Sequence, residues 1–276
     1  MNHGKTADPS VRFLSRLSFF DFSLAFSSFP DIFSRHQTSG SHMRLDKFIS
    51  DSAARSRSEI RKLIRYRAVT VNGSVPPSAD FQVRETDEVR LNGKLIPYRK
   101  FIYLMLNKPA GYLSAVEDKH DPVVVDLVPD EWKHFKVFPV GRLDKDTEGL
   151  LLLTNDGQFD HALMSPKKKI MKRYYAELDR PAVPEDIESF RAGMVFQDFT
   201  ARPAVLEITD DPEKVFIEIA EGKFHQVKRM CQKVGKEVVY LKRVKIGALA
   251  LDDSLKPGEM RELTPAEFQL LTAPGA

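Results

Sequence analysis

One charged stretch of the chain has the residue types and spacing to do chemistry. Residues 141–149 read Gly-Arg-Leu-Asp-Lys-Asp-Thr-Glu-Gly, with five charged side chains between two glycines. A carboxylate held in a fixed place beside a basic group can act as a nucleophile or as a general base. Asp144 is therefore a candidate catalytic group. The competing interpretation is a solvated surface turn in which Arg142 and Asp144 form an ordinary ion pair.

A calcium loop is a third interpretation of the same stretch, because Asp144, Asp146 and Glu148 alternate along it. An EF-hand loop needs a bidentate glutamate at its twelfth position. That position is Asn155, and leucines occupy the second half of the loop. The calcium interpretation is therefore rejected.

Two apolar segments must position this stretch. Residues 137–140, Val-Phe-Pro-Val, are typical of a short buried strand, and the four leucines at 150–153 are typical of another. The charged residues between them form a loop anchored at both ends in the core. Such an anchor can hold a carboxylate in place.

A possible basic partner for the carboxylate lies near the C-terminus, in the stretch Gly-Lys-Phe-His-Gln-Val-Lys-Arg-Met at 222–230. Apolar residues recur there at helical spacing, and Gly235 follows as a stop signal. Lys228 flanks the apolar stripe of this predicted helix. A lysine in that position can reach a neighbouring group, or it can extend its ammonium group to water.

Basic residues are clustered although the formal net charge is only +3. A capping box formed by Ser56 and Glu59 predicts the start of a helix. Three arginines follow on it at intervals of four residues and form one stripe that can face an anion. A second cluster surrounds the Lys-Lys-Lys run. We assign both clusters to RNA binding, with these residues: Arg57, Arg61, Arg65, Lys167 and Lys168.

Length and composition limit the classes of protein to which the chain can belong. With 276 residues and 42% hydrophobic content, the chain can form two folded domains. No apolar run approaches the roughly 20 residues of a membrane-spanning helix. Cys231 is the single cysteine, which excludes an internal disulfide and suits a reducing cytoplasm. We expect a cytoplasmic monomer without a membrane role.

The chain divides into three predicted regions. Residues 1–42 are rich in Ser and Phe without periodicity, and we predict a disordered extension. We assign its origin to an upstream start or to cloning, and the alternative is a transit peptide, although such peptides are poor in acidic residues. Residues 43–98 form a compact module of two helices followed by short strands. In residues 99–276, predicted helices and strands mix without regular alternation. This pattern predicts an α+β domain on a mixed, largely antiparallel sheet.

The first module resembles the S4 RNA-binding domain. Its opening, Met-Arg-Leu-Asp-Lys-Phe-Ile at 43–49, is close to the way such domains begin. The resemblance extends to about residue 95 and implies binding to RNA.

Three motifs in the second region resemble the RsuA branch of the RNA pseudouridine synthases. They are Gly-Arg-Leu-Asp at 141–144, Lys-Arg-Tyr at 172–174 and the stretch at 222–230, in the family's order behind the expected S4-like module. The resemblance implies that Asp144 is the catalytic aspartate, that Tyr174 stacks on the target base, and that Lys228 keeps Asp144 ionised. It also implies contacts with RNA for Arg142, and we assign His225 and Gln226 of the third motif to RNA binding as well.

The implied reaction breaks the N1–C1′ bond of uridine and rejoins the base through C5. Nothing is oxidised or hydrolysed, so we expect no cofactor and no metal. The sequence leaves open whether the carboxylate attacks as a nucleophile or removes a proton. We predict 16S ribosomal RNA, in a pre-ribosomal particle, as the substrate, because the chain lacks the long basic tail of several large-subunit relatives. The alternatives are 23S ribosomal RNA and a non-catalytic role in RNA binding or ribosome assembly.

Overall fold

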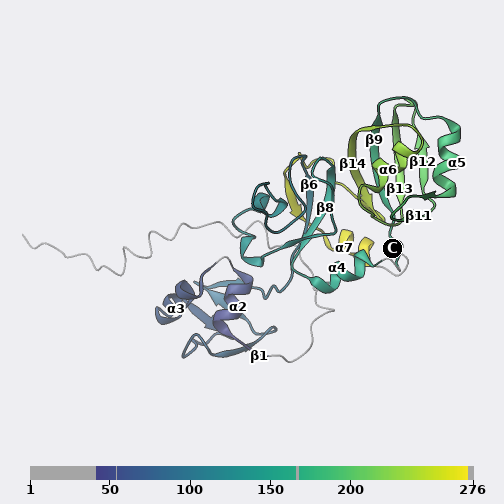
Figure 1. The fold of residues 1–276 in the computed structure, drawn as a ribbon. Coiled ribbons are helices and arrows are strands. Elements are labelled where there is room, and N and C mark those ends of the chain that lie inside the picture. Colours follow the sequence, from purple (N-terminus) through teal and green to yellow (C-terminus); the bar gives the residue numbers. More distant parts are fainter. Residues whose placement is uncertain (1–41, 54, 166–167, 273–276) are drawn as a thin grey trace, which may run out of the picture. The chain divides into compact units, whose positions relative to one another are not determined.

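A computed structural model describes residues 42–53, 55–165 and 168–272 (Figure 1). The predicted extension lies outside the described residues except for His42. His42 is not part of an extension, because it begins strand β1 (His42–Arg44) and pairs with Arg84 of β3 (Gln82–Arg84). Its backbone therefore belongs to the first folded module.

The first module has the predicted helices and small strands. They are α2 (Leu45–Ser52), α3 (Arg57–Arg65), β2 (Val69–Val71), β4 (Val89–Leu91) and β5 (Lys94–Ile96). Strands β2, β4 and β5 form an antiparallel sheet. The apolar sides of both helices, including Phe48 and Ile60, pack with these strands in one core.

The capping box at the start of α3 is confirmed. The Ser56 hydroxyl accepts a hydrogen bond from the Glu59 amide at 3.3 Å, and the Glu59 carboxylate accepts one from the Ser56 amide at 2.9 Å. These two bonds satisfy donors that the first turn of a helix leaves free.

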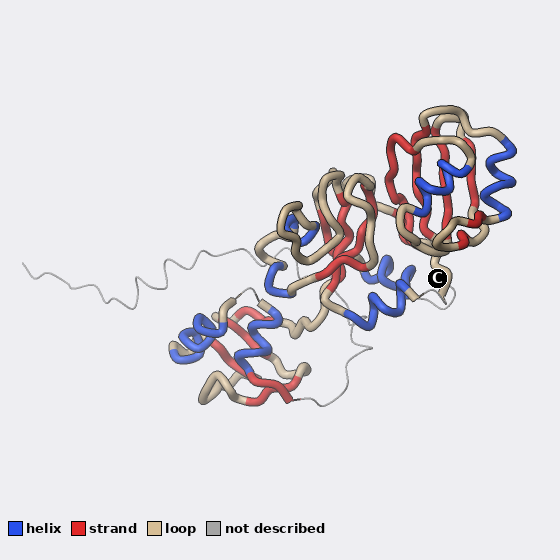
Figure 2. The backbone as a smooth tube through the Cα atoms, in the orientation of Figure 1, coloured by secondary structure: helices blue, strands red, loops and turns tan. Residues whose placement is uncertain are grey.

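The second region is built on a nine-stranded sheet, shown as red strands in Figure 2. Seven strands follow one path, and β7 and β15 pair at its side. In the order of the path they are β12 (Val205–Ile208), β13 (Lys214–Ile219), β9 (Lys172–Leu178), β14 (Val238–Ile246), β8 (Glu148–Thr154), β6 (Tyr103–Lys108) and β16 (Met260–Glu262). The side strands are β7 (Phe138–Val140) and β15 (Leu249–Ala250).

Every strand pair in this sheet is antiparallel except β14 with β8. The parallel pair has two residue matches, Lys242 with Glu148 and Arg243 with Gly149. The predicted α+β class with a mixed, largely antiparallel sheet is therefore confirmed. The remaining elements are α4 (Gly157–Met164), α5 (Pro184–Ala192), α6 (Gln226–Lys233), α7 (Pro265–Thr272), the 3₁₀ turns Val124–Leu127 and Lys133–Phe135, and the hairpin of β10 (Met194–Val195) with β11 (Thr200–Ala201).

The four leucines of β8 explain how one strand serves two cores. Side chains of a strand alternate between the faces of the sheet. Leu151 and Leu153 join one apolar cluster, which also holds parts of α5 and α6. Leu150 and Leu152 join the other cluster, with side chains of α4 and α7. Because both faces are covered, a continuous apolar run is required here where an alternating one would serve a half-exposed strand.

Gly149 begins the buried part of β8 at the junction with β14. Its φ is +97°, a backbone conformation that L side chains rarely adopt. A Cβ atom at this position would lie 2.3 Å from the backbone oxygen of Arg243. The second glycine of the charged stretch is thus required for the close approach of the parallel strands.

Candidate active site

Asp144 lies in the loop between β7 and β8, as predicted. The residue before it, Leu143, is buried in the core, and its backbone is held from both sides by Ser114. The Ser114 hydroxyl donates to the carbonyl oxygen of Leu143 at 2.9 Å and accepts from its amide at 3.0 Å. Asp144 therefore starts from a fixed backbone, while its own side chain stays 28% exposed.

A buried lysine holds the following residues of the loop. Lys108, at the end of β6, has no exposed surface, and its ammonium group donates three hydrogen bonds to backbone oxygens. The acceptors are Pro109 at 3.0 Å, Lys145 at 3.2 Å and Thr147 at 2.9 Å. The amide of Gly111 adds a bond of 2.7 Å to the same Lys145 oxygen.

The charge of Lys108 is balanced only in part by its surroundings. Burial lowers the pKa of Lys108 to about 8, while the nearby carboxylates of Asp146 and Asp144 act in the opposite direction. Each of the three carbonyl oxygens needs a hydrogen-bond donor, and the charged ammonium group supplies three N–H donors. The lysine thus ties the segment of the loop that follows Asp144 to β6.

Lys228 of α6 lies between the two aspartates of the loop. Its Nζ is 2.5 Å from Oδ1 of Asp146 and 3.6 Å from Oδ2 of Asp144. The ammonium group therefore pairs with both carboxylates, and its shorter contact is with Asp146. On the other side of Asp144, Nε2 of His225 lies 3.7 Å from Oδ1.

Lys228 lowers the pKa of Asp146. Burial raises the pKa of its carboxyl group, but the hydrogen bond and the charge of Lys228 outweigh burial, so the pKa lies below its ordinary value. Its side chain is 72% exposed, against 28% for Asp144. Asp146 is thus the outer of the two carboxylates.

A cavity connects the loop with β9, β14 and α6. Tyr174, which is 7% exposed, forms part of an apolar wall together with Ile219, Val227 and Leu241. Polar groups close the rest of the cavity, with these residues: Arg142, Asp144, Thr147, Lys223, His225, Gln226 and Lys228. The structure therefore brings the three predicted catalytic residues to one place.

The predicted RNA-binding residues occupy several environments. Arg142 and His225 line the cavity, Arg142 with an exposed side chain and His225 half-buried, whereas Gln226 is 3% exposed. The amide group of Gln226 is bonded to Glu221 and to the backbone of Lys223, so its described contacts hold a loop of the protein.

The remaining predicted contacts lie outside this cavity. The three arginines of α3 are exposed, and we call them the arginine stripe: Arg57, Arg61 and Arg65. Arg61 reaches Asp46 at 3.9 Å. Lys168 is exposed, and Lys167 lies outside the described residues. All of these RNA contacts stay predictions.

Three residues that hold the site were not assigned to it from the sequence. Lys108 belongs to Asn-Lys-Pro-Ala-Gly, which indicates only a turn, and Ser114 carries no local signal. Asp146 was considered as part of a calcium loop and as the next catalytic candidate after Asp144, but not as a partner of Lys228. The one sequence signal that could have identified Lys108 is its position. It lies at the end of a continuous apolar strand and directly precedes a turn, where a side chain is buried.

The described residues contain no group of three or more His, Cys, Asp or Glu side chains that could hold a metal ion. They also contain no helix that is long and apolar enough to cross a membrane.

Family models match both parts of the chain. The model of RNA pseudouridylate synthases matches residues 102–233, and the S4 domain model matches residues 43–94. The chain belongs to the RNA pseudouridine synthase family, in the branch that carries an N-terminal S4 domain. The domain boundary at residues 98 and 99 falls between the two matches and stays a prediction.

Relatives of the same family align with most of this chain. An uncharacterized RNA pseudouridine synthase of Bacillus subtilis is 46% identical and matches over 85% of this chain and 100% of its own length. Ribosomal small subunit pseudouridine synthase A of Escherichia coli is 41% identical over 82% of this chain and 98% of its own. A crystal structure of a pseudouridylate synthase is 38% identical, covers 83% of this chain and 99% of that one, and has a TM-score of 0.59.

Proposed function

We propose that this enzyme converts one uridine of 16S ribosomal RNA into pseudouridine, with Asp144 as its catalytic carboxylate. The observation that carries the proposal is the position of Asp144. It lies on a loop held by Ser114, at a cavity with a tyrosine wall, 3.6 Å from the ammonium group of Lys228.

The reaction requires no net exchange of atoms with the protein. The N1–C1′ bond breaks, a C5–C1′ bond forms, C5 loses a proton and N1 gains one. A carboxylate can attack or accept a proton only in its charged form. An opposite charge within about 4–6 Å favours that form, and Lys228 is within this distance of Asp144. We assign Lys228 to this role.

The target uridine has to leave its stack before Asp144 can reach it. Extrusion costs a few kcal/mol, and a pocket with an aromatic wall repays part of that cost. Tyr174 supplies such a wall beside Asp144, and we assign it to the stacking of the uracil ring. Arg142 lines the same cavity and has the charge to contact a phosphate group.

The choice of 16S ribosomal RNA is supported by relatives with the matching name. Proteins of Yersinia pestis and Escherichia coli named ribosomal small subunit pseudouridine synthase A are 38% and 41% identical to this chain. We place the reaction in the cytoplasm, in a pre-ribosomal particle, and expect the enzyme to act as a monomer. The exposed arginine stripe on α3 supports an RNA-binding role of the first module.

The test of the catalytic assignment is Asp144→Asn with Asp146→Asn as the matched control. The amide keeps the shape of the side chain but can neither attack nor accept a proton. We expect Asp144→Asn to lose turnover while binding to RNA survives, and Asp146→Asn to retain measurable turnover. Carbodiimide-dependent reverse-transcription stops on treated transcripts measure the product. Wild-type-like turnover of Asp144→Asn would contradict the assignment.

Maps of pseudouridine in both ribosomal RNAs test the substrate. A strain without the gene should lose one signal in 16S RNA and regain it when the gene is restored. Loss of a 23S signal with 16S RNA intact would overturn the choice of RNA and leave the reaction standing. Loss of no signal in either RNA would count against the reaction itself.

A further inference from the structure

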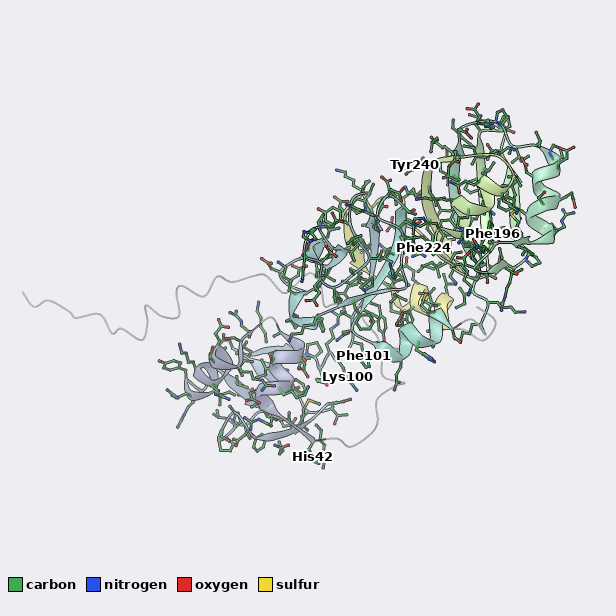
Figure 3. The ribbon with its side chains drawn as sticks, in the orientation of Figure 1. His42, Lys100, Phe101, Phe196, Phe224 and Tyr240 are labelled. Atoms are coloured by element: carbon green, nitrogen blue, oxygen red, sulfur yellow. The ribbon has the colours of Figure 1, made fainter. Side chains whose placement is uncertain are left out.

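Phe224 and His225 form a stacked aromatic pair at the cavity. His225 is the member of the pair that contacts the catalytic loop, at Asp144. Phe224, which is labelled in Figure 3, is 70% exposed. Its ring stacks on that of His225, with ring centroids 3.8 Å apart and planes at 19°. A single exposed apolar side chain is common on protein surfaces. This one is distinguished by its stacked neighbour, which lines the cavity and reaches Asp144.

The loop that carries the pair is rigidly held. The buried amide group of Gln226 accepts a hydrogen bond from the Lys223 amide at 3.0 Å and donates one to Glu221 at 3.0 Å. Glu221 in turn accepts a bond from the Arg202 amide at 2.9 Å. These bonds fix the turn between β13 and α6 from the inside.

His225 has a backbone conformation that its side chain disfavours. Its φ is +50°, in the left-handed region, directly before the first residue of α6. Residues keep such a conformation only where their surroundings enforce it, and they cluster at functional sites. Here the left-handed residue directly precedes α6, and its neighbour Phe224 is exposed.

Two partly buried aromatic residues of this domain have faces that are already occupied. Phe196 and Phe199 stack on each other, and the guanidinium group of Arg229 lies 4.8 and 4.7 Å from their centroids. Arg229 is itself paired with Asp198. Among the described residues, the ring that stacks on Phe224 is that of His225, which covers one face of the Phe224 ring. The other face is available to a flat partner.

The partner that fits this place is a nucleobase. When a uridine is extruded toward Asp144, the bases on either side of it lose a stacking neighbour. Aromatic side chains beside cationic groups are the general platform for unstacked bases. Lys223 and Arg142 line the same cavity and supply cations for the adjoining phosphates.

We propose that Phe224, backed by His225, stacks against the nucleobase next to the target uridine and holds the RNA strand while that uridine is extruded. The proposal rests on the proposed function, because it takes Asp144 as the position of the target. Phe224 is assigned a substrate contact and no part in the bond-breaking step.

The first test compares Phe224→Ala with Val195→Ala, a control at an equally exposed apolar side chain on β10. Loss of one stacked base weakens binding by about 5- to 150-fold. We expect Phe224→Ala to bind a 16S transcript that much more weakly, with KM raised and turnover at saturation reduced far less. Phe224→Tyr should restore binding, and Val195→Ala should behave as wild type. Equal melting temperatures confirm that all variants fold.

The second test reports on stacking without any turnover. Trp132 is the single tryptophan, so Phe224→Trp in a Trp132→Phe background places one fluorophore at the site. Quenching of this indole by a 16S transcript is expected, because a nucleobase stacks on it. Wild-type affinity of Phe224→Ala together with no quenching would overturn the proposal, even if pseudouridine forms normally. If the wild-type protein forms no pseudouridine while the indole is still quenched, the result would count against the proposed function alone. A Phe224→Ala defect confined to protein-containing particles would show a protein partner and overturn the nucleobase assignment.

Discussion

Replacement of Lys108 by methionine tests whether a buried charge positions the catalytic loop. Methionine keeps the length and apolar stem of lysine but removes the donor of three hydrogen bonds, to the backbone oxygens of Pro109, Lys145 and Thr147. The loop then loses its attachment to β6 at both ends of the segment that follows Asp144. A shift of about 1 Å in a reacting group costs about 100-fold in rate. We expect turnover at saturating RNA to fall by about this factor while RNA affinity changes little.

The same variant has a distinct signature in the pH dependence of stability. Burial lowers the pKa of Lys108 from 10.5 to about 8 in the folded chain. Between these two pH values the unfolded chain holds a proton that the folded chain has released, so stability rises with pH. From pH 7 to pH 9.5 this single group adds about 2 kcal/mol to the free energy of unfolding. Methionine has no such group, so this rise disappears in the variant.

The assay is denaturation by urea at pH 7 and pH 9.5, followed by the fluorescence of Trp132, which packs against the core of the same domain. Lys145→Met is the matched control, since its exposed ammonium group is paired with Asp121 at 2.7 Å and contributes less than about 1 kcal/mol. The control should keep the wild-type rise in stability. An unchanged rise in Lys108→Met, or wild-type turnover, would refute the positioning role.

Three further changes test other parts of the structure. Conversion of the whole arginine stripe to glutamine should weaken RNA binding and reduce its salt slope by up to about three unit charges, measured by titration at several salt concentrations; an unchanged slope would mean that α3 does not face RNA. Gly149→Ala should destabilise the domain by several kcal/mol, because its Cβ would meet the Arg243 oxygen at 2.3 Å, and a melting temperature equal to wild type would contradict this. Lys236→Met leaves the buried carboxylate of Asp186 without its partner at 2.6 Å, which should cost about 3–5 kcal/mol in urea denaturation, whereas the paired change Lys236→Met with Asp186→Leu should recover most of it.

Local patterns were sufficient to predict most elements of the fold. The helix that begins after Ser56 and the strand formed by the leucines at 150–153 were predicted, because a capping box and a continuous apolar run are local signals. The first positions of β8 were predicted as loop. Glu148 and Gly149 are strand residues because they pair with β14, which lies more than 90 residues further along the chain.

The candidate site was predictable only where its residues act through their own chemical type. Asp144, Tyr174 and Lys228 were found through motifs and lie at one cavity. The preference of Lys228 for Asp146 over Asp144 depends on a difference between 2.5 and 3.6 Å, which no spacing rule contains. Ser114 acts through two backbone bonds to a residue 29 positions away. Such contacts arise only from the tertiary fold.

The short parallel match between β8 and β14 makes the active site a composite of two sheet halves. Asp144 lies in the loop that leads into the start of β8, whereas Tyr174 is on β9, which pairs with β14. The two strands match at two residue pairs, and the Tyr240 hydroxyl adds a bond of 2.8 Å to Glu148 beside them. A small change in twist where β8 meets β14 would therefore change the distance between the Asp144 carboxylate and a base stacked on Tyr174. Side chains at this junction can tune the reaction geometry without touching the RNA.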